Sequence, residues 1–155
     1  MKCVLRTATT KSTADVILLD ASCIVGLFLG EPGQPDVVAA LTNECEMSVL
    51  NRAEVIDRIT RKGATADDVA ADLDTLGITY IALDVDTADL AARLRARHYH
   101  RLECPLSMAD CVALATALAT GSTLATSDSH LAAVGRANGC AILPVANSSG
   151  DYPSV

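Results

Sequence analysis

The sequence predicts an α/β fold, a three-layer α/β/α sandwich with a mostly parallel central sheet. Two observations lead to this prediction. Short apolar runs, such as VILLD at 16–20 and CAILPV at 140–145, have the composition of strands that are buried on both faces of a sheet. Between such runs lie longer segments with helical apolar spacing, for example NRAEVIDRITRK at 51–62. Strands that alternate with helices imply parallel crossovers and a sheet that is covered on both faces.

The expected elements alternate along most of the chain. Strands are expected at 16–20, 46–50, 78–84, 122–127 and 140–145. Helices are expected at 22–30, 35–43, 51–62, 65–77, 86–98, 107–120 and 128–139. Gly63 and Gly121 directly follow two of these helices, as is typical of a helix C-terminus. Thr65 has the hydroxyl side chain that caps the start of a helix.

The length of 155 residues suits one domain with a substantial core. We expect that domain to span residues 16–145. Residues 1–15 are polar beyond the first few and have no clear period, so we expect a loose N-terminal arm there. Residues 146–155 are expected to form a C-terminal tail, because they are rich in turn-forming residues.

The composition restricts the classes of function. The chain has 12 Lys+Arg against 19 Asp+Glu, and its net charge of −7 at first argues against a nucleic-acid partner. Three Tyr, one Phe and no Trp are too few for a protein that reads RNA by stacking bases on aromatic side chains. Any RNA would therefore be held through its phosphates.

The cysteines and the apolar segments indicate a cytoplasmic protein. None of the six cysteines has the spacing of a zinc-ligand pair, so we expect reduced and mostly buried thiols. The longest uncharged stretch, 111–127, is too short and too polar to cross a bilayer, so no membrane association is expected.

Four acidic residues lie where a parallel α/β sheet binds its ligands, beyond the carboxyl ends of the strands. Asp20 closes the first strand, and Glu54 is expected in the first turn of the helix that follows the second strand. Asp110 is expected in the first turn of helix 107–120, and Asp128 follows strand 122–127. Because these strand ends meet at one edge, we expect the four carboxylates to converge.

Each of these acids also has a purely structural interpretation. Asn51-x-x-Glu54 and Ser107-x-x-Asp110 both fit the capping-box pattern at a helix start. Glu54 can also pair with Arg58 one helical turn later. The other two acids can act as simple helix caps.

Burial and charge argue against a purely structural role. Helix 107–120 is apolar or small on all sides after Asp110, and Asp20 closes a fully apolar strand, so both charges would be partly buried. None of the three lysines follows a strand. Two carboxylates 4 Å apart in a partly shielded setting repel by about 4 kcal/mol, a cost that a divalent cation converts into binding. Ligands that are all oxygen atoms select Mg²⁺ or Mn²⁺ over zinc.

The stretches ILLDASCIV, MSVLNRAEVIDR, PLSMADCVALATA and STLATSDSHL occur in this order between residues 16 and 145. Together they resemble PIN-domain ribonucleases, and most closely the toxins of bacterial VapBC toxin–antitoxin pairs. In that family four acids hold one or two Mg²⁺ or Mn²⁺ ions. The matching positions here are Asp20, Glu54, Asp110 and Asp128.

The resemblance also covers two hydroxyl residues. Ser22 and Thr126 match positions from which we expect hydrogen bonds to the site. Two departures concern arginines that the family often has, because this chain carries Cys111 after the third acid and Ser129 after the fourth. Neither departure removes a metal ligand, although each removes a possible phosphate contact.

The resemblance implies a metal-dependent endoribonuclease that acts as a toxin, with RNA as substrate, a cognate antitoxin as partner and a homodimer as the assembly. Eight of the 12 basic residues lie in two short segments, from which we select Arg58, Arg61, Arg93 and Arg97 as candidate phosphate contacts. Solvated helix faces are the structural alternative for these arginines. The alternative function is a non-catalytic PIN-like module that binds RNA or protein, and the intact set of four acids argues against it.

Overall fold

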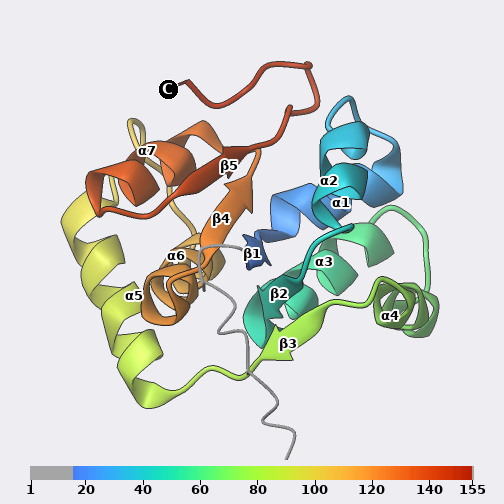
Figure 1. The fold of residues 1–155 in the computed structure, drawn as a ribbon, viewed down its shortest axis with the longest axis horizontal. Coiled ribbons are helices and arrows are strands. Elements are labelled where there is room, and N and C mark those ends of the chain that lie inside the picture. Colours follow the sequence, from blue (N-terminus) through green and yellow to red (C-terminus); the bar gives the residue numbers. More distant parts are fainter. Residues whose placement is uncertain (1–15, 155) are drawn as a thin grey trace, which may run out of the picture.

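A computed structural model describes residues 16–154 as strands alternating with helices (Figure 1). The strands are β1 Ile17–Leu19, β2 Cys45–Ser48, β3 Thr79–Ile81, β4 Thr123–Thr126 and β5 Ile142–Pro144. The helices are α1 Ala21–Leu29, α2 Gln34–Ala40, α3 Val49–Thr60, α4 Ala66–Thr75, α5 Val85–His98, α6 Met108–Thr120 and α7 Ser129–Ala137. Each element overlaps a segment in which the sequence predicts its type. The expected N-terminal arm, residues 1–15, lies outside the described residues.

The five strands form one parallel sheet in the order β3-β2-β1-β4-β5. From β1 the chain builds the sheet first toward β2 and β3, and later toward β4 and β5 on the other side. The reversal falls between β1 and β4, and such a switch point is where open α/β sheets bind their ligands. The predicted fold class is confirmed.

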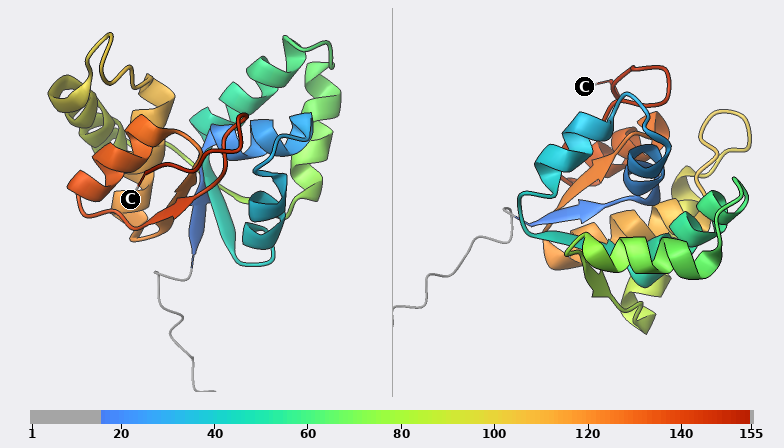
Figure 2. Two further views of the ribbon diagram at one scale, coloured as in Figure 1. Left: turned by 90° about the horizontal axis from the view of Figure 1, so that it is seen from above. Right: turned by 90° about the vertical axis from the view of Figure 1, so that its right-hand side faces the viewer.

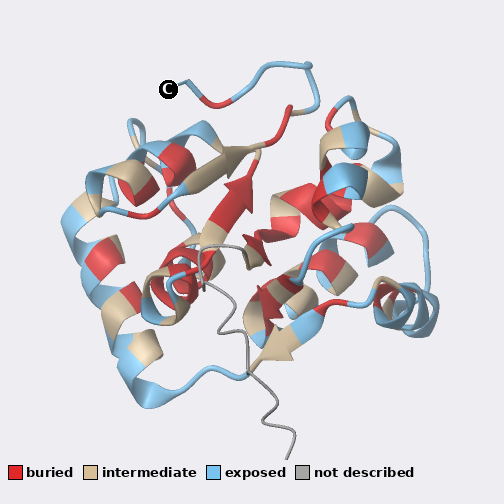
Figure 3. Ribbon diagram, viewed as in Figure 1, coloured by how far each residue is buried: buried red, intermediate tan, exposed pale blue. Residues whose placement is uncertain are grey.

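Alternate residues along the strands face opposite helical layers. Leu19 and Met47 belong to a core formed with α1 to α4, whereas Leu18 and Leu124 belong to a core formed with α5 to α7. The left view in Figure 2 shows these two helical groups on opposite sides of the sheet. Figure 3 shows buried residues along the strands and on the inner helix faces. The three layers follow from this alternation.

The start of α3 differs from the sequence prediction. The sequence predicts a strand over 46–50 and a helix beginning at Asn51, but β2 ends at Ser48 and α3 begins at Val49. The Ser48 side chain accepts a hydrogen bond from the Asn51 amide and caps the helix. Asn51 is therefore inside the helix, and Glu54 lies in its second turn rather than its first.

The described part of the expected C-terminal tail packs against α2. The amide of Ala146 donates to Asp36 Oδ2 at 3.1 Å, and the Tyr152 hydroxyl donates to Asp36 Oδ1 at 3.4 Å. Gly33 lies directly under this segment, because a Cβ atom at that position would be 2.2 Å from the carbonyl oxygen of Ala146. The tail therefore requires a residue without a side chain at position 33.

The thiols of the described residues are free. Cys23, Cys45, Cys111 and Cys140 are buried and Cys104 is half-buried, while Cys3 lies outside the described residues. Among residues 16–154 no helix is both long and apolar enough to span a membrane.

Candidate active site

Asp20 lies at the carboxyl end of the central strand β1, immediately before α1, and it is 1% exposed. Its Oδ2 atom accepts hydrogen bonds from Ser22 Oγ at 2.7 Å and from Thr126 Oγ1 at 3.1 Å. Its Oδ1 atom accepts one from Asn51 Nδ2 at 3.3 Å. Within residues 16–154 no basic side chain forms an ion pair with Asp20, so neutral donors alone hold this carboxylate. The two hydroxyl residues that the sequence analysis selected both contact it.

Asp110 lies in the first turn of α6 and completes a capping box with Ser107. The Ser107 amide donates to Asp110 Oδ2 at 2.6 Å, and the Asp110 amide donates to Ser107 Oγ at 3.0 Å. The structural interpretation of this acid is therefore correct. The cap occupies one carboxylate oxygen and leaves Oδ1 for another ligand.

Glu54 projects from α3, and its two oxygen atoms have different surroundings. Oε1 lies 3.6 Å from Arg58 Nη1, as the i,i+4 spacing suggested. Oε2 is buried and has no hydrogen-bond partner in the described structure. The capping box expected between Asn51 and Glu54 is wrong, because Ser48 occupies the cap position.

Asp128 caps α7, where its Oδ1 atom accepts a hydrogen bond from the Leu131 amide at 2.9 Å. The Asp128 amide in turn donates to Thr126 Oγ1 at 3.0 Å. Thr126 therefore contacts both Asp20 and the segment that carries Asp128. The residues around the switch point between β1 and β4 form one hydrogen-bonded group.

Electrostatics link the acids to one another. Burial, followed by the charge of Asp110 and more weakly that of Glu54, raises the pKa of Asp20 to about 7, although Ser22 and Thr126 oppose the rise. Burial and the charge of Asp110 raise the pKa of Glu54. Burial and the charge of Asp128 raise the pKa of Asp110, against its hydrogen bonds with Ser107. The fold thus concentrates negative charge at the edge where the sequence predicted it.

These residues fit a divalent cation by their chemistry. The donor set consists of carboxylate oxygens, which Mg²⁺ and Mn²⁺ prefer. The Oε2 atom of Glu54 is buried and has no hydrogen-bond partner among the described residues, so it is free to bind a ligand. A buried oxygen without a partner lowers the stability of the fold, and a bound cation would remove this cost. In the described part of the chain, no three acidic, His or Cys side chains are yet close enough to hold an ion together. A cation would therefore have to draw the carboxylates inward.

The four candidate phosphate-contacting arginines lie in different surroundings. Arg58 is beside the acids, because it pairs with Glu54 and its charge lowers the pKa of Asp110. Arg61 pairs with Asp57 at 2.7 Å and Arg93 with Asp89 at 3.6 Å, and all four of these side chains are mostly exposed. Arg97 is exposed on α5.

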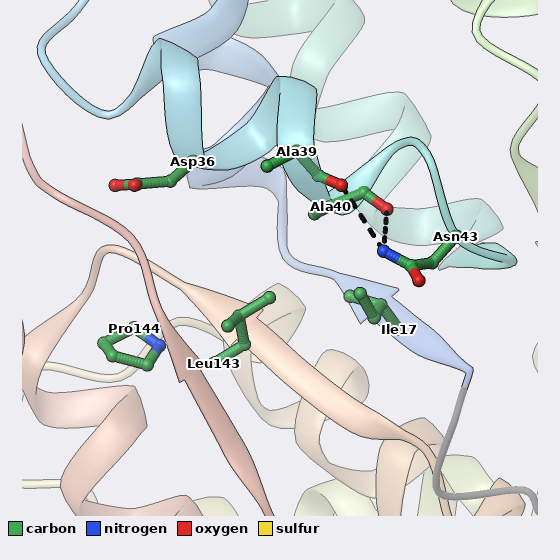
Figure 4. Close-up of a pocket in the computed structure, with 7 residues that line it drawn as sticks. All are labelled: Ile17, Asp36, Ala39, Ala40, Asn43, Leu143 and Pro144. Atoms are coloured by element: carbon green, nitrogen blue, oxygen red, sulfur yellow. Dashed lines mark hydrogen bonds between the residues drawn. The ribbon is translucent and has the colours of Figure 1, made fainter.

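Two hollows in the surface differ in their chemical character and in their position relative to the acids. One, of about 370 Å³, is lined by the ends of α1 and α3: Val25, Leu29, Glu31, Arg58, Arg61 and Lys62. It joins basic side chains to the neighbourhood of Glu54. The other, between α2 and strands β1 and β5, is mainly apolar and contains none of the four acids (Figure 4). In Figure 4 the Asn43 amide donates to the carbonyl oxygens of Ala39 and Ala40, which ends α2.

Sequence reasoning missed Asn51. Its side chain is completely buried and lies between Asp20 and the start of α6. The signal is present in the spacing Asn51-x-x-Glu54, but the same spacing also fits a helix cap. Residues three positions apart on a helix lie on the same face. The spacing of Asn51 and Glu54 could therefore have indicated that Asn51 lies beside the acids.

The parallel sheet and its acidic edge define an α/β/α domain with a candidate site at the topological switch point. The chain belongs to the PIN domain family, whose model matches residues 17–137. No curated protein matches the sequence.

Solved structures share the fold. The toxin VapC20 from Mycobacterium tuberculosis, described as cleaving the sarcin-ricin loop, superposes with a TM-score of 0.63 at 18% identity, over 77% of this chain and 95% of that chain. VapBC-1 from nontypeable Haemophilus influenzae gives a TM-score of 0.59 at 16% identity, over 83% and 96% of the two chains. FitAcB from Neisseria gonorrhoeae gives 0.58 at 22% identity, over 82% and 96%.

Proposed function

We propose that this protein is a metal-dependent ribonuclease that hydrolyses RNA phosphodiester bonds, with Asp20, Glu54, Asp110 and Asp128 as its site. One observation carries the proposal. Asp20 is completely buried, forms no ion pair within the described residues, and experiences the charges of two further carboxylates. Such an arrangement costs folding free energy, and the ligand that offsets it is a cation.

The four acids would hold one or two Mg²⁺ or Mn²⁺ ions. When bound, such an ion supplies charge stabilisation at the phosphate and makes a nearby water more acidic. The carboxylate oxygens that accept no structural hydrogen bond would be the ligands, namely Glu54 Oε2, Asp110 Oδ1 and Asp128 Oδ2, together with the remaining lone pair of Asp20 Oδ1. Ser22 and Thr126 orient Asp20 from its Oδ2 side.

Basic residues would position the RNA through its phosphates. Arg58 lies beside the acids, and Arg61 lines the same hollow between α1 and α3. Arg93 and Arg97 are exposed on α5, in the other helical layer, and would contact the RNA separately from Arg58 and Arg61. The ion pairs that Arg61 and Arg93 form are exposed, and exposed pairs contribute only about 0–1 kcal/mol, so phosphate can replace the acidic partner. These contacts position a strand without specifying its sequence.

We also propose that the chain is the toxin of a toxin–antitoxin pair, bound by a cognate antitoxin and assembled as a homodimer. Support comes from the fold, which is shared with proteins described as toxins or as toxin–antitoxin complexes. Light scattering on the purified chain tests the dimer. Expression in bacteria tests the toxin role: wild type should stop growth and Asp20→Asn should not.

RNA cleavage tests the enzymatic proposal directly. Wild type, Asp20→Asn and Asp110→Asn are incubated with a labelled random-sequence RNA pool and either Mn²⁺ or Mg²⁺. Asp72→Asn is the matched control, because Asp72 is an exposed acid on α4. We expect cleavage by wild type and the control, and at least about a hundredfold loss in both site variants, since each removes a charged ligand.

Two outcomes would contradict the proposal. Cleavage that persists in excess chelator, or that is unchanged in Asp20→Asn and Asp110→Asn, would exclude these acids as the metal site. RNA binding by wild type without any cleavage in either metal would instead support the non-catalytic binding module.

A further inference from the structure

Asn51 joins three segments of the chain that each carry, or adjoin, one of the site acids. Its Nδ2 atom donates to Asp20 Oδ1 at 3.3 Å and to the carbonyl oxygen of Ala109 at 3.4 Å. Ala109 directly precedes Asp110 in α6. Asn51 itself lies on α3, three residues before Glu54. One amide group therefore connects the end of β1 with the starts of α3 and α6.

The Asn51 side chain is fixed at both of its polar ends. Its Oδ1 atom accepts a hydrogen bond from the Ser48 hydroxyl, and the Ser48 hydroxyl oxygen accepts one from the backbone N–H of Asn51. The residue is 0% exposed, so water does not compete for these bonds. Both Nδ2 hydrogens have an acceptor and the carbonyl oxygen has a donor, so the side chain cannot rotate without losing all three.

We infer that Asn51 is a positioning residue, which fixes the Oδ1 atom of Asp20 and the start of α6 at set distances from Glu54. This inference rests on the proposed function. The three acids repel one another, and repulsion alone would move α3 and α6 away from Asp20. The Asn51 amide opposes this separation, because it binds both the Asp20 carboxylate and the backbone beside Asp110. Since the amide is neutral, it leaves the negative charge of the site unchanged.

The chemistry of the amide suits this role better than other side chains of similar size. Aspartate has no hydrogens to donate and would add a negative charge beside Asp20. Leucine has similar volume but no polar atoms. Serine is too short to span from Ser48 to Asp20, and a lysine or arginine would neutralise the carboxylate that the cation needs. Asparagine offers two donors and one acceptor, which is what its three partners require.

The test compares wild type with Asn51→Leu and Asn51→Ser. The control is Asn138→Leu, because the Asn138 amide is also held, donating to the Val134 carbonyl at 2.8 Å, but lies at the end of α7. Three quantities are measured: Mn²⁺ affinity without RNA, from the electron paramagnetic resonance signal of free Mn²⁺; kcat and KM for the RNA pool; and the urea midpoint of unfolding.

We expect both Asn51 variants to bind Mn²⁺ about 10–100-fold more weakly and to lose kcat, because residues that orient metal ligands typically have effects of this size. KM should stay within about twofold, since Asn51 is buried away from the phosphate contacts. The control should lose stability at most. Asn51→Ser introduces no bulky apolar group beside Asp20, so it decides the question if Asn51→Leu does not fold.

The outcomes separate this inference from the proposed function. If wild type neither binds Mn²⁺ nor cleaves RNA, the proposed function fails and the inference with it. If wild type does both, and folded Asn51 variants retain its Mn²⁺ affinity and kcat, only the positioning role is wrong. A lowered urea midpoint with unchanged Mn²⁺ affinity would also exclude the positioning role, because it is what a purely structural residue would produce.

Discussion

The buried carboxylate of Asp20 should make the metal-free protein less stable as the pH rises from 5 to 7. Burial and the neighbouring acids raise its pKa from 3.8 to about 7. Between these two values the folded protein keeps a proton on Asp20 that the unfolded chain has lost. Unfolding then releases this proton, so the free energy of unfolding falls with rising pH in this window. Below 3.8 both states are protonated, and above about 7 both are ionised.

The size of the effect follows from the two pKa values. A difference from 3.8 to about 7, at about 1.4 kcal/mol for each pH unit, corresponds to about 4 kcal/mol of lost stability. That is a large part of the roughly 5–15 kcal/mol that holds a typical domain folded. The raised pKa values of Glu54 and Asp110 act in the same direction.

Asp20→Asn should remove most of this slope. The amide cannot ionise, but its NH₂ group would face either Asn51 Nδ2 or the hydroxyls of Ser22 and Thr126, a mismatch that costs about 1 kcal/mol. The two stability curves should therefore cross. Above pH 3.8 wild type loses about 1.4 kcal/mol for each pH unit, so its curve falls below that of the variant at about pH 4.5. Wild type should be more stable at pH 4, and the variant should be more stable at pH 8.

Urea unfolding in EDTA, followed by circular dichroism at several pH values from 4 to 8, measures these curves. Asp72→Asn is the control and should keep the slope of wild type. At pH 8, Mn²⁺ at a hundredfold excess over its Kd should raise the free energy of unfolding of wild type by about 3 kcal/mol. The same Mn²⁺ concentration should leave the free energy of unfolding of Asp20→Asn unchanged. A flat wild-type curve, or equal slopes in wild type and Asp20→Asn, would refute the reasoning.

Three further predictions use the same structure. Ser107→Ala removes the cap of α6 and should lower the free energy of unfolding by about 1 kcal/mol in urea; an unchanged value would mean that the capping box contributes nothing. Gly33→Ala places a methyl group against the Ala146 carbonyl and should cost about 1–3 kcal/mol, seen as a lower Tm; an equal Tm would show that the tail moves freely. Arg61→Ala, combined with Asp20→Asn to prevent cleavage, should reduce the salt dependence of RNA affinity by about one unit of log–log slope in fluorescence anisotropy, and an unchanged slope would exclude a phosphate contact.

The architecture was predictable because it depends on patterns that persist over many residues. Apolar runs such as VILLD at 16–20 suit strands that are buried on both faces, and their alternation with helices requires a parallel sheet. Once the sheet is parallel, residues that follow strands must meet at one edge. Asp20 and Asp128 could therefore be placed near each other although more than a hundred residues separate them.

The position of Asn51 could not be predicted in the same way, because it depends on where one helix begins. Val49 and Leu50 are apolar and suit the end of a strand as well as the start of a helix. Ser48 decides between the two by accepting a hydrogen bond from the Asn51 amide, and this moves the helix start to Val49. A shift of two residues changed Asn51 from an expected helix cap into a buried residue that contacts Asp20 and Ala109.

The arginines show a second limit. The spacing of Glu54, Arg58 and Arg61 places the first two on α3 and the third at its C-cap. It does not determine that Arg58 pairs with Glu54 whereas Arg61 pairs with Asp57, since long side chains on a helix surface can reach partners in either direction. Proximity to the acids is a property of the folded surface, and it distinguishes Arg58 from the other three candidates.

The structural and functional interpretations of the acids are not alternatives, because each structural contact helps the chain to retain the corresponding charge. Asp110 and Asp128 lie at helix N-termini, where backbone amides and the helix dipole favour negative charge. Glu54 has Arg58 beside one oxygen. Such contacts are worth about 1 kcal/mol each, less than the roughly 4 kcal/mol that a close pair of like charges costs. The fold can therefore assemble the acids without a cation but cannot fully offset their repulsion, and under the proposed function the remainder would drive cation binding.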